Sequence, residues 1–331
     1  MTGPEVVAPP IHGVVIGGTG GVWQVRTDDG TVVDASMRGR LKKSNSGKRP
    51  DGSLRRDTIL AGTANLKLAV GDDIHLEQSE RGDGWAIAEI LPRRSKLARR
   101  APGGGQGERI VAANVDQVVI MFAAAKPDPH PRMLDRFLVI AEGNDLPARI
   151  IVNKVDLVGE DVARERFGDY ERIGYPVHYT CVKTGAGLEG ARAMLSGRRS
   201  VLTGPSGVGK SSLLNALFPG SNLRVGAISE SVNKGRHTTV GAIMLPLPDG
   251  DGGYVIDTPG LREVGMWSLP ADRLEHCFPE MRHLREGCRF ADCRHVTEPD
   301  CTIRDALQKG AISAARYDSY LRLLEELESG A

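Results

Sequence analysis

The stretch VLTGPSGVGKSS, at residues 201–212, constrains the fold of this chain more than any other. It contains Gly204-x4-Gly209-Lys210-Ser211, placed after an apolar run and before a helical one. Glycines at these positions let backbone N–H groups converge on phosphate oxygens, at the positive end of the following helix. Lys210 should reach the β and γ phosphates, and the Ser211 hydroxyl should bind Mg²⁺. The predicted phosphate loop comprises Gly204, Pro205, Ser206, Gly207, Val208, Gly209, Lys210, Ser211 and Ser212.

A second motif, NKVD, lies about fifty residues earlier and follows the apolar run ARIIV. It consists of Asn153, Lys154, Val155 and Asp156. The Asp156 carboxylate has two acceptor oxygens, which match the N1–H and the exocyclic amine of guanine. Adenine lacks both donors there, so a buried site of this kind rejects it. Asn153 would support the loop and the Lys154 stem would cover the ring, although a simple turn after a strand also favours these residue types.

Two further segments predict a switch that senses the γ phosphate. DTPG at 257–260 follows a strand, so that Asp257 would hold Mg²⁺ through water and the Gly260 N–H would contact the γ phosphate. KGRHTTV at 234–240 supplies Thr238 and Thr239, one of which should complete the Mg²⁺ shell when triphosphate is bound. The same threonines also suit an ordinary strand.

The composition is that of a soluble globular protein. The chain has 331 residues, of which 40% are hydrophobic and 26% charged, and its length favours two or three domains. No apolar run approaches the roughly 20 residues that span a bilayer, and no secretory signal is visible, so we expect a cytoplasmic protein that does not bind membranes. Basic residues crowd 38–56 and 93–100, which indicates either nucleic-acid contact or a solvated loop.

The pattern of apolar residues changes twice along the chain. Short strands and turns fill residues 11–91, including the hairpin signal GVWQVRTDDGTVVDA, which suits a small barrel of the oligonucleotide-binding type. Residues 93–110 are basic and glycine-rich and read as a linker. From QVVIMFAA at 117–124, apolar strands alternate with helices, which predicts a mostly parallel sheet with helices on its faces. Residues 302–329 are strongly helical.

We therefore predict three domains. The N-terminal barrel covers 1–97 with 1–10 loose, the α/β nucleotide-binding domain covers 98–268, and a metal-binding and helical domain covers 269–331.

Five cysteines are present, an odd number that argues against a disulfide framework. Three of them lie close to one histidine in sequence, and these four residues supply the three sulfurs and one nitrogen of a closed tetrahedral zinc site. The predicted ligands are Cys288, Cys293, His295 and Cys301. The alternatives are a buried thiol cluster without metal, or substitution of His276, Cys277 or His283 for one of the ligands.

The base-reading motif precedes the phosphate loop, which reverses the usual order. NKVD, CVKTGAGL at 181–188, the phosphate loop, the threonine segment and DTPG together resemble a translation-factor-type GTPase in circular permutation. CVKTGAGL is similar to the loop that closes over guanine O6, with Cys181 and Val182 in place of the usual Ser-Ala. With a barrel before it, ERIVAANVDQVVI at its start and Cys-x4-Cys-x-His-x5-Cys after it, the chain resembles the bacterial GTPases that depend on the small ribosomal subunit.

The resemblance implies a function and a set of partners. It implies a circularly permuted P-loop GTPase domain with an N-terminal oligonucleotide-binding-type barrel and a C-terminal zinc-binding, helical domain. It further implies GTP and GDP with Mg²⁺, one structural Zn²⁺, contact of the barrel and zinc domain with ribosomal RNA, and a role in late maturation of the small subunit. Hydrolysis would be stimulated by the subunit, and we expect a monomer.

The sequence also predicts a set of catalytic residues. Many GTPases place Gln directly after the DxxG glycine to orient water, but Leu261 occupies that position here, so we expect slow unaided hydrolysis. His237 is the candidate to orient water, although a surface histidine is more often inert. The predicted catalytic set is His237, Lys210, Thr238, Thr239 and Gly260.

Two other functions compete with the GTPase. A nucleotide kinase also suits GPSGVGKSS but needs neither NKVD nor DTPG, and it would make GDP from GMP and ATP. The second is a non-catalytic RNA-binding factor that nucleotide merely stabilises. The permuted order itself suggests a hypothesis, in which DTPG directly before the C-terminal domain lets a change at the γ phosphate move an RNA-binding domain.

Overall fold

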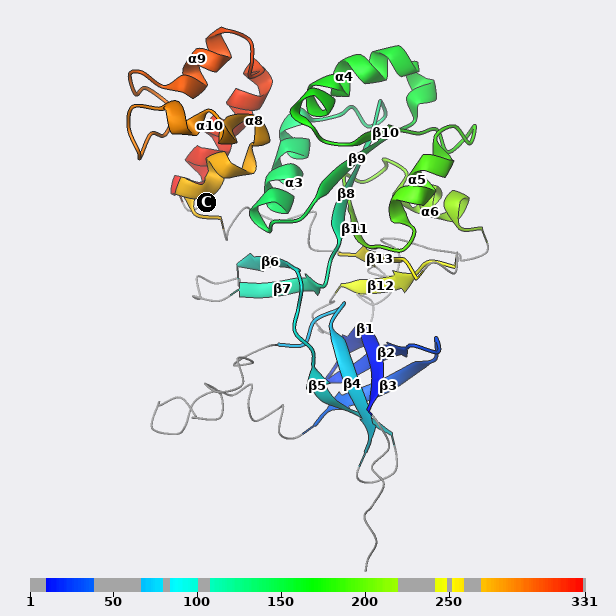
Figure 1. The fold of residues 1–331 in the computed structure, drawn as a ribbon. Helices are drawn as coiled ribbons and strands as arrows, with labels where there is room; N and C mark the ends of the chain where they lie inside the picture. Colours follow the sequence, from blue (N-terminus) through cyan, green and yellow to red (C-terminus); the bar gives the residue numbers. More distant parts are fainter. Residues whose placement is uncertain are drawn as a thin grey trace, which may run out of the picture.

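The computed structural model describes residues 10–38, 67–79, 84–100, 108–219, 242–248, 252–258 and 269–329. These residues form a small β-barrel, a six-stranded sheet covered by helices, and a C-terminal group of short helices (Figure 1). Some predictions fall outside the described residues. They concern the N-terminal nine residues, the basic segment 39–56, His237, Thr238, Thr239, Gly260 and Leu261.

Five strands close the N-terminal barrel in the order β1-β2-β3-β5-β4. They are β1 (Ile11–Thr19), β2 (Val22–Thr27), β3 (Val32–Met37), β4 (Asp73–Gln78) and β5 (Trp85–Ile90). Alternate side chains point inwards, and Val15, Val25, Ile74, Leu76 and Ile87 form its core. β2 and β3 pair antiparallel across their turn, which confirms the hairpin predicted from the sequence.

The central sheet has the strand order β10-β9-β8-β11-β13-β12, and only β12 runs antiparallel to its neighbour. Its strands are β8 (Gln117–Ala123), β9 (Ala148–Asn153), β10 (Val177–Tyr179), β11 (Arg199–Thr203), β12 (Ile243–Pro246) and β13 (Tyr254–Asp257). The chain enters this sheet at its centre through β8 and returns later to place β11 beside it. The strands that precede the two predicted nucleotide motifs, β9 and β11, therefore flank β8 on opposite sides.

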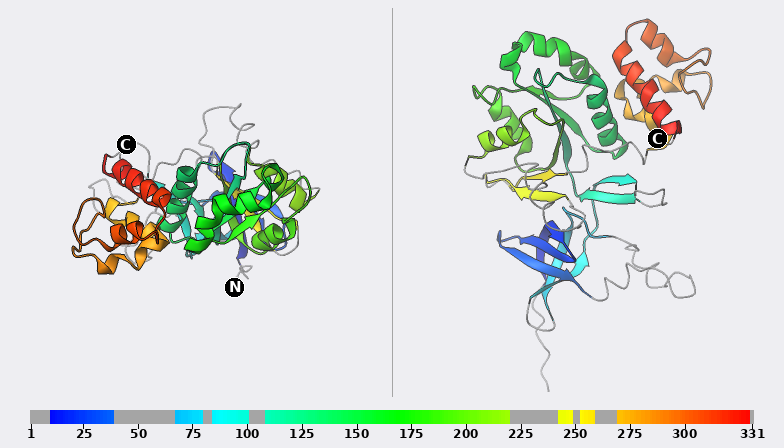
Figure 2. Two further views of the ribbon diagram at one scale, coloured as in Figure 1. Left: turned by 90° about the horizontal axis from the view of Figure 1, so that it is seen from above. Right: turned by 180° about the vertical axis from the view of Figure 1, so that it is seen from behind.

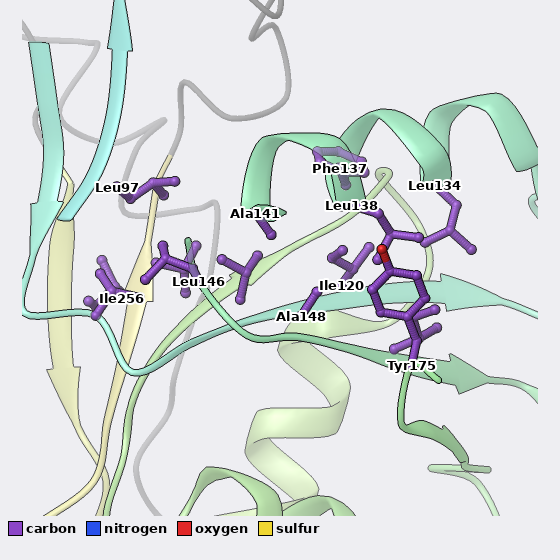
Figure 3. Close-up of a cluster of buried hydrophobic side chains, with 14 of the residues drawn as sticks. Leu97, Ile120, Leu134, Phe137, Leu138, Ala141, Leu146, Ala148, Tyr175 and Ile256 are labelled. Atoms are coloured by element: carbon purple, nitrogen blue, oxygen red, sulfur yellow. The ribbon is translucent and has the colours of Figure 1, made fainter. Parts of the chain in front are cut away.

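Helices cover both faces of the sheet (Figure 1). One face packs against α3 (Pro131–Gly143) and α4 (Glu160–Ile173), and the other against α5 (Leu188–Leu195) and α6 (Lys210–Leu217). β8 is buried along its whole length because its alternate side chains serve both layers. Figure 3 shows the first layer, in which Phe137, Leu138 and Ala141 of α3 lie over Ile120 and Ala148 of the strands.

A two-stranded hairpin lies between the barrel and the sheet (Figures 1 and 2). It pairs β6 (Lys96–Arg100) with β7 (Glu108–Ala113). The segment 93–110, predicted as a linker, therefore contains ordered strand at both ends. Leu97 and Ala112 belong to the core of the α/β part, with exposures of 1% and 0%. The strands were not predicted because the segment is mostly basic and glycine-rich and has few apolar residues.

The barrel is attached at the amino ends of two sheet strands. Arg199, the first residue of β11, donates from Nη2 to Asp73 Oδ1 of β4 at 2.7 Å. Arg26 of β2 donates to the hydroxyl of Tyr254, the first residue of β13, at 3.1 Å. The opposite ends of β11 and β13 lead into the predicted phosphate loop and DTPG. The barrel thus meets the same strands at the end remote from the nucleotide motifs.

The C-terminal part consists of short helices around their own apolar core. They are η3 (Ala271–Cys277), α8 (Pro279–Arg282), η4 (Arg285–Gly287), α9 (Thr302–Gln308) and α10 (Ala314–Ser329). Phe278, Met281 and Ile303 are fully buried in this core. The helical prediction for 302–329 is confirmed in type, but the chain breaks into two helices near Gly310, whose φ is +73°.

Within the described parts of the chain, no helix is long and apolar enough to cross a membrane.

A buried ionic cluster fixes the C-terminal part to α3. Arg316 of α10 is 2% exposed and donates to Asp135 of α3 at 2.6 Å and to Glu280 of α8 at 2.7 Å. Ser319 and Tyr170 also donate to the Asp135 carboxylate. Burial by itself lowers the pKa of Arg316, but the two carboxylates outweigh it and raise the pKa, so the cation is retained.

Replacing Arg316 by Leu should destabilise the protein, because Asp135 and Glu280 would stay buried without a cation. Removing one partner of a buried ion pair costs about 3–5 kcal/mol. Urea unfolding measures this loss. Arg322→Leu is the control, since Arg322 pairs with Asp318 at an exposed position and should change stability by about 0–1 kcal/mol. Equal effects of the two substitutions would contradict the proposed role of the cluster.

Candidate nucleotide-binding site and metal centre

The predicted phosphate loop joins the end of β11 to the start of α6. Gly204 has φ +134°, and a Cβ there would lie 2.0 Å from the Met121 carbonyl oxygen. Gly209 has φ +101°, and a Cβ there would lie 2.6 Å from Asn153 Nδ2. Both positions therefore require glycine. The Lys210 Nζ is turned into the loop, where it donates to the carbonyls of Gly204 and Pro205 at 2.8 and 2.7 Å.

The side chain of Asn153, the last residue of β9, connects the NKVD motif with the phosphate loop and with the residues around CVKTGAGL. Its Nδ2 donates to the Val208 carbonyl of the phosphate loop at 2.9 Å. Its Oδ1 accepts from the Thr180 hydroxyl at 3.2 Å and from the Val182 N–H at 3.4 Å. The side chain is only 2% exposed, so these bonds are protected from water.

Lys154 crosses from the NKVD motif to the phosphate loop. Its backbone is left-handed, with φ +61°, at the entry to the short helix η1 (Val155–Leu157). From there its Nζ donates to the carbonyls of Gly207 at 2.7 Å and Lys126 at 2.5 Å. Two NKVD side chains thus contact the phosphate loop, although the contacting residues lie 55 and 53 positions apart in the sequence.

Asp156 lies in η1, at an exposed position. A buried carboxylate was expected here from the sequence, so discrimination of Asp156 against adenine depends on a bound base that covers it. One of its oxygens, Oδ1, accepts a hydrogen bond from the Cys181 thiol at 3.1 Å. Cys181 is 2% exposed and forms an isolated bridge to Ala186 across the CVKTGAGL loop. Cys181 stands where similar guanine-binding loops have Ser, and the sequence alone did not predict its contact with Asp156.

DTPG begins at the end of β13, which pairs with β11. Because the two strands are parallel, their carboxyl ends place Asp257 on the same edge of the sheet as the phosphate loop. Asp257 and Thr258 are 9% and 4% exposed. The Thr258 hydroxyl has no hydrogen-bond partner among the described residues, so this edge retains a buried polar group.

A second cluster of polar side chains lies in the C-terminal part. The donor atoms of Cys288, Cys293, His295 and Cys301 all lie within 4.8 Å of one another. His295 Nδ1 is 3.3 Å from Cys301 Sγ and 3.7 Å from Cys288 Sγ, and the two sulfurs are 3.9 Å apart. A tetrahedral zinc site with Zn–S bonds of about 2.3 Å places its sulfurs roughly 3.8 Å apart. The four residues therefore fit a Zn²⁺ ion.

Burial and hydrogen bonding set the charge state of this cluster. Burial raises the pKa of Cys293 to about 12 and lowers the pKa of His295, which keeps the ring neutral. For Cys288, hydrogen bonds from Thr302 outweigh burial and lower the pKa to about 7. Because a metal binds thiolates and a neutral imidazole, binding of an ion here must release the proton that burial keeps on Cys293.

The residues considered as substitute ligands lie apart from this cluster. Cys277 is buried against α3, close to Gly143, and burial raises the pKa of its thiol to about 12. His276 and His283 are exposed. In the described chain, the only group of this kind therefore consists of the four predicted residues.

Comparison with known proteins assigns the fold to a family. Residues 90–267 match the family model described as RsgA GTPase. The chain belongs to the RsgA GTPase family. One relative, "Small ribosomal subunit biogenesis GTPase RsgA" of Gemmatimonas aurantiaca, is 55% identical over 316 residues, which cover 95% of this chain and 97% of the relative. Another, "Small ribosomal subunit biogenesis GTPase RsgA 2" of Bacteroides thetaiotaomicron, is 35% identical over 324 residues, which cover 97% of this chain and 98% of the relative.

Two solved structures have the same architecture as this RsgA family member. The crystal structure of YjeQ from Thermotoga maritima superposes with a TM-score of 0.74 at 31% identity, covering 97% of this chain and 99% of YjeQ. YloQ, described as a circularly permuted GTPase, gives 0.70 at 24% identity over 100% and 99% of the two chains, which supports the fold alone. The reversed order of motifs is therefore the circular permutation of the RsgA GTPase fold, as predicted.

Replacing Cys181 by Ala should weaken GDP binding, because Asp156 would lose a hydrogen bond that orients its carboxylate. A bond of this kind contributes about 0.5–1.5 kcal/mol, or roughly a two- to tenfold change in Kd. Titration calorimetry measures the affinity. Cys181→Ser is the matched control, since its hydroxyl keeps a donor and should preserve binding. Unchanged affinity of the Ala variant would show that the thiol does not support the site.

Proposed function

We propose that this protein is a GTPase that binds the small ribosomal subunit and acts in its late maturation, hydrolysing GTP to GDP and phosphate. The proposal rests chiefly on the contacts that Asn153 and Lys154 make with the phosphate loop. Because the two loops touch, one guanine nucleotide is long enough to meet Asp156 with its base and the loop amides with its phosphates. The names of the RsgA relatives support the ribosomal role.

The nucleotide site would use the residues predicted from the sequence. Asp156 would accept from guanine, Asn153 and Val155 would hold its loop, and the Lys154 stem would cover the ring. The amides between Gly204 and Ser212 would bind the phosphates, with Lys210 at the β and γ groups. Mg²⁺ would be held by Ser211, by Asp257 through water and by Thr238 or Thr239, and it would neutralise phosphate charge.

Hydrolysis transfers the γ phosphoryl group to water. The bond between the γ phosphorus and the β–γ bridging oxygen breaks as the water oxygen bonds to phosphorus, and the water proton passes to phosphate or solvent. Lys210 and the Gly260 N–H would stabilise charge on the phosphoryl oxygens. Leu261 cannot orient the water, so we propose that His237 does so when the protein is bound to the subunit.

The other parts of the chain would recognise RNA. We propose that two domains contact ribosomal RNA: the barrel, an oligonucleotide-binding-type domain over 1–97 with its basic segment, and the C-terminal domain over 269–331. Residues 98–268 would form the GTPase domain.

One structural Zn²⁺ would be held by Cys288, Cys293, His295 and Cys301. Four protein ligands leave no position for water, so this ion would stabilise structure rather than catalyse. The protein would act as a cytoplasmic monomer.

Purified small ribosomal subunits should accelerate GTP turnover by this protein, while turnover without them stays slow. Phosphate release from GTP, with and without subunits, measures the effect. A rate that subunits leave unchanged would contradict the proposal, and conversion of GMP with ATP into GDP would favour a nucleotide kinase instead. Salt-dependent RNA binding without stimulated turnover would favour a non-catalytic RNA-binding factor.

In the same assay, His237→Ala should keep nucleotide affinity but lose stimulation by subunits, because only the attacking water would lose its partner. Stimulated turnover equal to that of the unchanged protein would remove His237 from the mechanism. Lys210→Ala is the reference for loss of phosphate binding.

Removal of zinc with a strong chelator should lower the Tm by several degrees, since binding free energy of a structural metal contributes to folding free energy. GDP affinity should stay the same, because the metal centre lies in the C-terminal part and the nucleotide loops lie at the sheet edge. Differential scanning calorimetry and calorimetric titration with GDP measure the two quantities. An unchanged Tm after verified metal removal would argue against a structural ion.

A further inference from the structure

The imidazole of His295 contacts a buried carboxylate on the side away from the thiols. His295 Nε2 lies 2.6 Å from Glu275 Oε2, whereas Nδ1 faces Cys301 and Cys288. His295 is 0% exposed and Glu275 is 5% exposed. A buried carboxylate is costly unless it accepts hydrogen bonds, so this pair is a specific arrangement rather than a surface contact.

We propose that Glu275 is a positioning residue for the metal centre, an inference that rests on the proposed zinc ion. A neutral imidazole carries its proton on one nitrogen, and Glu275 accepts a hydrogen bond from Nε2–H. The lone pair is then on Nδ1, the atom that faces the sulfurs. His295 therefore ligates through Nδ1, and the carboxylate makes the ring more basic towards the metal.

Other contacts hold both partners in place. Arg285 of η4 forms an ion pair with Glu275, which balances the buried charge. The His295 backbone adopts a left-handed conformation with φ +62°, and its carbonyl accepts from the Tyr317 hydroxyl at 2.5 Å. With the backbone fixed in this way, the hydrogen bond to Glu275 selects the nitrogen that meets the metal.

Glu275 also places the metal centre in contact with the segment that packs on the GTPase part. It lies on η3, between Leu274 and Cys277, which are both buried, and Cys277 packs near Gly143 of α3. The same short helix therefore contacts α3 with some side chains and the metal ligand His295 with another. A metal that holds His295 also orders η3 at the boundary between the two parts.

Zinc affinity of the full-length protein, measured by competition with a chromogenic chelator, tests this role. Glu275→Ala should weaken zinc binding about 10- to 100-fold, the usual effect of losing such a partner. Glu275→Gln keeps the shape but removes the charge, and we expect about a tenfold loss. Asp272→Asn is the matched control, because Asp272 lies on the same η3 at an exposed position and should have no effect.

Cobalt substitution gives a second readout that a general loss of stability would not move. The thiolate-to-cobalt absorption should persist in Glu275→Gln, since three sulfurs remain, while the ligand-field bands should shift as the nitrogen ligand weakens. If Glu275→Ala fails to fold, the Gln variant decides alone. A Gln variant with unchanged zinc affinity and an unchanged cobalt spectrum would overturn the role of Glu275, whereas failure of the unchanged protein to bind zinc would overturn the metal site itself.

Discussion

The candidate nucleotide site depends on one buried amide, the side chain of Asn153. It ends β9, and its two polar atoms bond to the phosphate loop and to the residues around the CVKTGAGL loop. Since the group is almost completely buried, loss of the bond to Val208 would leave Nδ2 as a desolvated donor. Together with the contact of Lys154 with Gly207, this side chain fixes the distance between the NKVD motif and the phosphate loop, which in the proposed function is the distance that one nucleotide spans.

The same strands connect this site to the rest of the molecule. β11 and β13 carry the nucleotide motifs at their carboxyl ends and the barrel contacts of Arg199 and Tyr254 at their amino ends. The C-terminal part is fixed to α3 through the buried Arg316 cluster. Such an ion cluster opposes free movement of this part relative to α3. The hypothesis that the γ phosphate moves an RNA-binding domain is therefore best tested by substitutions in the connection from DTPG to η3.

Much of this organisation was predictable from local patterns. The phosphate loop, the NKVD motif and the Cys-His cluster each combine residue types whose chemistry has few alternatives. In α3 the apolar residues recur at spacings of three and four, and β8 is one continuous apolar run. The β6–β7 hairpin was missed because its stability comes from Leu97 and Ala112 packing into a distant core. The break between α9 and α10 depends on one left-handed glycine within an otherwise helical composition.

The sequence by itself determined which chemical groups this protein has, because phosphate, guanine and metal recognition require particular residue types at short spacings. Only the tertiary structure decided which groups meet. The contacts of Lys154 with Gly207, of Cys181 with Asp156 and of Glu275 with His295 all join positions 20 to 53 residues apart. No periodicity encodes such pairs, since they arise from strand order and helix packing, which depend on the burial of the whole core at once.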